Sequence, residues 1–180
     1  MKPIPNRHRK PIPKRHRSSS GQALIEFALI LPLLFLLIVN VINFGGMLYA
    51  WICVSNAART GAQYYITGGA TVGAPVPPTV PLVQTLVLAD LHPLPNSATA
   101  QVCVSTSTSA TVSCNTGLPP ADAPPAADSA EGTVTYPVAA VDVKYTYLPF
   151  IPLWDFPALR IHTTLPPTAI HRQAIMRILE

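Results

Sequence analysis

The residues able to do acid–base or nucleophilic chemistry are few and widely spaced in this chain. His92, His162 and His171 lack the spacing of a metal-binding motif such as HExxH. Asp142 and Asp155 have no obvious partner at a useful spacing, and GxSxG and P-loop patterns are absent. We therefore predict that the protein is not an enzyme, holds no metal or cofactor, and carries these histidines as solvated surface residues.

Glu26 is the ionisable residue in the most unusual setting. It lies just inside a long apolar run, and residues 27–54 contain no charged side chain. A carboxylate at the centre of a spanning helix costs roughly 2.5–3.5 kcal/mol, so an acid inside a membrane marks a functional site by default. Two interpretations stay open: Glu26 acts within the membrane, or it lies at the headgroup boundary and is merely solvated.

The apolar run itself predicts a membrane-spanning helix, with the lipid bilayer as a partner. A bilayer core about 30 Å thick needs roughly 20 helical residues. A helix over residues 22–65 would be roughly 65 Å long, so only about half of it fits the bilayer. Pro32 should kink the helix near its start, while Tyr49 and Trp51 suit the outer membrane–water interface.

The segment before the helix is strongly basic. Residues 1–20 contain the repeats PIPNRHR and PIPKRHR and hold seven of the 12 Lys and Arg residues, with no acid. Alternating proline and dense like charge predict disorder. Basic residues beside a first spanning helix hold that end in the cytoplasm, and we favour this role over nucleic-acid binding. The rest of the chain, with five basic and eight acidic residues, would then lie outside the cytoplasm.

The residues around the start of the helix resemble a known processing site. GQALIEF at 21–27 places a glycine, four residues, a glutamate and an aromatic in order, as in type IV prepilins of the Flp class. The longer segment GQALIEFALILPLL, followed by SNAARTGAQY at 55–64, is similar to the TadE/TadG family of pilus-assembly proteins. The resemblance covers residues 20–66, about a quarter of the chain.

That resemblance implies a role for four residues. Gly21 would be the last residue of a leader removed by a prepilin peptidase, and Gln22 would become the new N-terminus. Glu26, followed by Phe27, would be the fifth residue of the mature chain. Its carboxylate would neutralise the N-terminal ammonium of a neighbouring subunit, an attraction that is strong in a packed bundle of low dielectric constant.

Small residues recur at helical spacing along the outer half of the predicted helix. Such spacing lets a second helix approach closely, which favours packing against another pilus subunit. The alternative is that the same face packs on the protein's own outer domain, and both can apply at different levels. The residues are Gly46, Ala50, Ala57, Ala58, Gly61 and Ala62.

Residues 67–180 are predicted to form a small outer part of α+β type. Residues 67–98 form a proline-rich connector with a short helix at 81–92, whose apolar face we assign to Leu82, Leu86 and Ala89.

Residues 99–180 read as a β domain interrupted by a Pro/Ala-rich loop at 115–130. The expected strands are 99–105, 110–114, 133–147, 159–165 and 171–179. In the third of these, Val141, Val143, Tyr145 and Tyr147 alternate with polar residues. We expect these strands to form an antiparallel sheet against the outer half of the helix.

Two of the three cysteines are placed to form a disulfide. Cys103 and Cys114 lie on neighbouring predicted strands, and an oxidising compartment favours their bonding if the strand register lets the sulfurs meet. Closing so short a loop stabilises by roughly 3 kcal/mol. Cys53, in the outer part of the helix, is expected to be a buried small hydrophobe.

Together these features favour a pilin-like structural or assembly component of a Tad (Flp-type IV) pilus. It would be anchored in the bacterial inner membrane, with a basic leader at 1–21 removed after Gly21, a helix at 22–66, and an outer domain. The alternative is an uncleaved, single-pass accessory protein that recruits pilus or secretion machinery through that domain.

Overall fold

The computed structural model describes residues 20–68, 78–119, 129–132, 134–152 and 164–178. The predicted leader up to residue 19 lies outside these residues, as do His162, Asp155, most of the loop at 115–130 and most of the strand predicted at 159–165. The chain divides into two compact units, residues 1–37 and 38–180, which are described separately below.

The first unit contains the beginning of helix α1 (Ser20–Thr67), which runs through Pro32 as a helix. Every side chain from residue 21 to residue 37 is exposed. The helix from Gly21 to Thr67 is long and apolar enough to cross a membrane. Its most apolar stretch has a mean hydropathy of 2.7, and only 6% of that stretch is buried. Water does not favour so much exposed apolar surface, whereas a lipid environment does.

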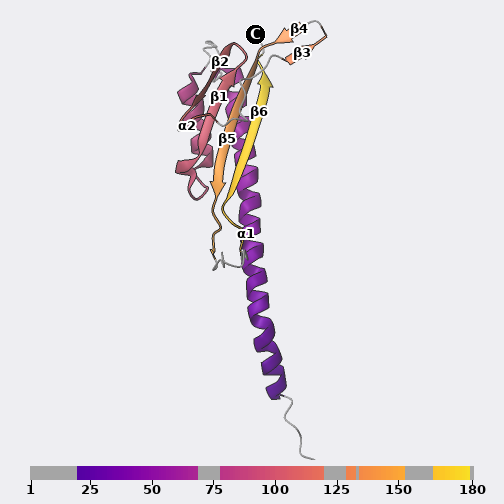
Figure 1. The fold of residues 1–180 in the computed structure, drawn as a ribbon. Coiled ribbons are helices and arrows are strands. Elements are labelled where there is room, and N and C mark those ends of the chain that lie inside the picture. Colours follow the sequence, from indigo (N-terminus) through magenta and orange to yellow (C-terminus); the bar gives the residue numbers. More distant parts are fainter. Residues whose placement is uncertain (1–19, 69–77, 120–128, 133, 153–163, 179–180) are drawn as a thin grey trace, which may run out of the picture. The chain divides into compact units, whose positions relative to one another are not determined.

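The second unit holds the rest of α1 and a four-stranded antiparallel sheet in the order β2–β1–β5–β6 (Figure 1). The strands are β1 (Gln101–Thr106), β2 (Ser109–Cys114), β5 (Val138–Tyr147) and β6 (Thr168–Arg177). A separate pair joins β3 (Ser129–Glu131) to β4 (Val134–Tyr136). Helix α2 (Val80–Leu91) and the short 3-10 helix η1 (Ser97–Thr99) precede β1.

The apolar face predicted along β5 is confirmed, but Asp142 on its other face is also buried. Val141, Val143, Tyr145 and Tyr147 are buried in the main core, and the two residues at 144 and 146 are exposed. Because alternate residues of a strand point to opposite faces, this pattern places one face of the sheet on the core. The predicted α+β class, with a small antiparallel sheet packed on the outer part of α1, is confirmed.

The face of α1 that meets this sheet is made of small side chains. Ala50, Val54, Ala57, Ala58 and Ala62 are each no more than 1% exposed and belong to the same core cluster as β5. Small residues at helical spacing bring the helix backbone close to the strands, so the larger tyrosines and valines of the sheet fill the space between them.

The apolar face assigned to α2 was wrong. The helix buries Val83, Val87 and Leu91, whereas Leu82 is 48% exposed and Ala89 is exposed. Both faces of this helix are rich in apolar residues, so periodicity alone did not distinguish them. Packing against β1 and against Gly61 of α1 decided the matter, because compact, β-branched valines fit there.

Candidate functional site

The predicted processing segment lies at the start of α1, within the first unit. The side-chain amide of Gln22 donates a hydrogen bond of 3.2 Å to a carboxylate oxygen of Glu26, one helical turn away. A Cβ added to Gly21 would meet nothing within 4 Å. Packing within the single chain therefore does not require glycine at position 21. The side chains of Gln22, Glu26 and Phe27 are likewise exposed.

The small residues predicted to pack against another subunit are occupied within the chain. Ala50, Ala57, Ala58 and Ala62 lie in the core, which matches the alternative that this face packs on the protein's own domain. A Cβ added to Gly61 would lie 2.5 Å from a methyl carbon of Val87, so glycine is required for this approach. Contact of these residues with another copy stays a prediction.

Gly46 is required by a different segment. A Cβ built there would lie 2.1 Å from the ring of Phe150 and 2.8 Å from the hydroxyl of Tyr147. The aromatic rings of Tyr147 and Phe150 pack edge to face, with centroids 6.1 Å apart. The chain that follows β5 therefore rests directly on the backbone of α1 at this level.

Asn43 fixes that same segment, although it is a polar residue within the apolar run. Its side chain is buried and donates a hydrogen bond of 2.9 Å to the carbonyl of Ile151, while its amide oxygen accepts one of 3.1 Å from the Ile151 N–H. The hydroxyl of Tyr147 donates a 2.8 Å bond to the Asn43 carbonyl. A buried amide is tolerated because its polar groups are paired. The signal in the sequence was the amide itself, interrupting an otherwise apolar stretch.

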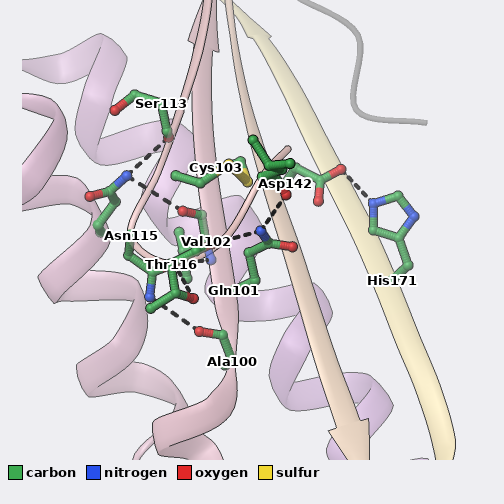
Figure 2. Close-up of a disulfide and its surroundings, with 12 residues drawn as sticks. Ala100, Gln101, Val102, Cys103, Ser113, Asn115, Thr116, Asp142 and His171 are labelled. Atoms are coloured by element: carbon green, nitrogen blue, oxygen red, sulfur yellow. Dashed lines mark hydrogen bonds and ion pairs between the residues drawn. A yellow bond between two sulfur atoms is a disulfide. The ribbon is translucent and has the colours of Figure 1, made fainter. Parts of the chain in front are cut away.

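The far face of the sheet carries the disulfide and a buried acid. Cys103 and Cys114 are directly opposite in the β1–β2 register and form the predicted disulfide, with Cα atoms 4.0 Å apart. Asn115, the next residue, accepts a 2.8 Å hydrogen bond from the Val102 N–H and donates one to the Ala100 carbonyl (Figure 2). These bonds continue the pairing of the two strands past the disulfide and help to hold its register.

Asp142 has a partner that the sequence analysis missed. It is 3% exposed, lies on β5 directly opposite Cys103 of β1, and its carboxylate is 2.5 Å from the imidazole Nε2 of His171 on β6 (Figure 2). The two residues are 29 positions apart, so only strand pairing brings them together. His171 is half-buried rather than a solvated surface residue. Because the adjacent sulfurs are joined to each other, no thiol nucleophile lies beside this pair.

A polar cavity lies between α1 and β6. It has a volume of about 330 Å³ and its lining includes Trp51, Arg59 and Arg172. The guanidinium of Arg172 stacks on the Trp51 ring at 3.6 Å from its centroid, a favourable cation–π geometry. Its Nε is buried, and no described atom accepts a hydrogen bond from it. Two positive groups in one cavity can receive an anionic group.

Cys53 is half-buried and packs against the core without being part of it, so the predicted buried hydrophobe is only partly enclosed. Among the residues that the structure describes, no group of three histidine, cysteine or acidic side chains could hold a metal ion.

Comparison with known proteins gives one match. Residues 21–63 match the model of a family described as TadE-like protein, which covers the apolar part of α1 and most of its domain-facing part. Comparisons with curated proteins and with solved structures find no match.

Proposed function

We propose that this chain, whose residues 21–63 match the TadE-like family model, is a pilin-like component of a Tad-type pilus, held in the bacterial inner membrane by α1. Its outer domain lies outside the cytoplasm. The protein acts through structure and assembly rather than catalysis, with other pilus subunits as partners.

One observation supports this proposal. Residues 21–63, which match the family model, lie in an apolar helix, and no other part of the described chain packs on its first residues, 21–37. The helix of a soluble core would be buried by its neighbours, whereas residues 21–37 are exposed on every side. One face of the remainder of the same helix contributes to the core of the outer domain. One element therefore serves both as an anchor and as a support for the sheet.

The proposal includes removal of the leader after Gly21 by a prepilin peptidase. The open space around Gly21 supports it, because no packing within the chain explains a glycine there. After cleavage, Gln22 would carry a new ammonium group one helical turn from the carboxylate of Glu26. The carboxylate of Glu26, if it lies inside the membrane, is favourable when a cation of a neighbouring copy is within about 4 Å. It is costly when it has no such partner.

The N-terminus of the mature protein tests processing. We would express the full chain with an active prepilin peptidase and, as the control, with a catalytically inactive one, and determine the N-terminal residue of the membrane-extracted protein by mass spectrometry. A chain that begins at Gln22 only with the active peptidase supports the proposal. An intact leader in both samples favours the alternative, a permanently anchored accessory protein.

The role of Glu26 is tested separately. The variant Glu26→Ala should still insert in the membrane, since it removes a charge from an apolar segment, yet it should reduce pilus assembly. Asp90→Ala is the matched control, because Asp90 is an exposed acid on α2, outside the anchor. Wild-type pilus numbers in the Glu26 variant would contradict the charge-pairing role.

A further inference from the structure

The segment that follows β5, residues 148–152, exposes apolar side chains at its attachment to α1. Leu148 is 42% exposed, Phe150 is 52% exposed and Ile151 is 36% exposed. The ring of Phe150 packs over Gly46. Both the N–H and the carbonyl of Ile151 are hydrogen-bonded to the side chain of Asn43. The segment is thus held in place by the helix while its apolar side chains stay partly exposed.

The helix level at which it is held coincides with the expected edge of the membrane. About 20 helical residues cross a hydrocarbon core of about 30 Å. Counted from Leu24, just before Glu26, that length ends at Asn43. The residues that contact segment 148–152, Asn43 and Gly46, therefore lie where the helix leaves the hydrocarbon.

We propose that segment 148–152 is a second membrane contact, with Leu148 and Phe150 inserted in the outer lipid interface. The inference rests on the proposed membrane anchoring of α1 and adds a site that the anchor does not require. Its partner is the lipid surface itself, in the region where acyl chains meet headgroups.

The hydrogen bonds of Asn43 make this placement physically possible. Non-helical backbone at membrane depth is tolerated only when its polar groups are paired, because lipid offers them no partners. Asn43 pairs both the N–H and the carbonyl of Ile151 and is itself shielded from lipid by burial. This also gives the amide inside the apolar run a role: it pairs the backbone N–H and carbonyl of Ile151 in the segment that touches the bilayer.

The experiment uses the full-length protein in liposomes, with single nitroxide labels and accessibility to oxygen and to a water-soluble nickel chelate. Cys53→Ser removes the free thiol, and labels are placed through Leu148→Cys or, independently, Phe150→Cys. Leu34→Cys reports the anchor. Thr108→Cys, an exposed position in the β1–β2 turn, reports the aqueous face of the domain.

The proposal predicts high oxygen and low nickel accessibility at both segment positions, with an oxygen-to-nickel ratio several-fold above that at Thr108 and approaching that at Leu34. High nickel accessibility at 148 and 150 would overturn it by placing them in water. Low accessibility to both reagents would also overturn it, because that pattern indicates burial by another protein surface. High nickel accessibility at the Leu34 position would instead refute the membrane anchor. Failure of the anchor and failure of the second membrane contact therefore give different results.

Discussion

Gly61→Ala should destabilise the second unit, residues 38–180, even though alanine is the better helix former. The added Cβ would lie 2.5 Å from a methyl carbon of Val87 and 3.3 Å from one of Val141. Carbon atoms that pack well are about 3.5–4.0 Å apart, so Val87 must move by about 1 Å. Both valines are fully buried, and valine has few rotamers by which to withdraw. Overpacking of this kind costs about 1–3 kcal/mol.

A matched control isolates that cost. Gly45 lies in the same helix, but a Cβ added there meets nothing within 4 Å. Both substitutions gain the preference of alanine for helix, about 1 kcal/mol, so this gain cancels in the comparison. The free energy of unfolding of Gly61→Ala should therefore be about 1–3 kcal/mol below that of Gly45→Ala.

The comparison is measured by thermal unfolding of the full-length proteins in one mild non-ionic detergent, followed by near-ultraviolet circular dichroism. For a domain of this size the expected difference in Tm is about 3–10 °C. Adding Val87→Ala to each variant should shrink the difference, because it removes the clashing methyl groups. Equal Tm values for the two glycine variants would refute the close approach of α2 to α1.

Three further outcomes are expected. Asn43→Ala should speed amide hydrogen exchange at Ile151 and cost about 1–3 kcal/mol of stability, because it leaves part-buried backbone groups of Ile151 unpaired; unchanged exchange would count against these hydrogen bonds. Replacing both Cys103 and Cys114 by alanine should lower the free energy of unfolding by roughly 3 kcal/mol in urea titrations, and a reductant should reproduce the loss in the wild type. Burial, and to a lesser degree a neighbouring tyrosine, raises the pKa of Tyr145 above its ordinary 10.0. The unfolded chain then loses this proton first, so Tm should fall as pH rises past about 10, and Tyr145→Phe should flatten that fall.

The two roles of α1 bear on how the protein could assemble. Its small-residue face is filled by the chain's own sheet and α2, as Ala57 and Gly61 show. A neighbouring subunit that leaves this domain intact would therefore meet other faces of the helix, including the exposed apolar residues near its start. Glu26 lies in that uncovered part, which is consistent with its proposed pairing to another copy.

Three features could be predicted from the sequence because each is a local pattern: the apolar run, the Gly21-to-Phe27 segment and the alternation along β5. A long run without charge predicts a spanning helix, and period two predicts a strand with one buried face. The family match at residues 21–63 agrees with the resemblance that the Gly21-to-Phe27 segment indicated. The disulfide needed one further fact, the register that places Cys103 opposite Cys114.

Only the tertiary structure decided which surfaces meet. It turned α2 to bury Val87 instead of Leu82. Both faces of that helix were apolar, and packing against Gly61 and β1 distinguished them, together with the hydrogen bonds of Gln84 to the strands. It paired Asp142 with His171 and Asn43 with Ile151, contacts separated by 29 and 108 positions. Local patterns specify a residue's own element, but the partner of a polar side chain depends on how distant elements pack, which no local period encodes.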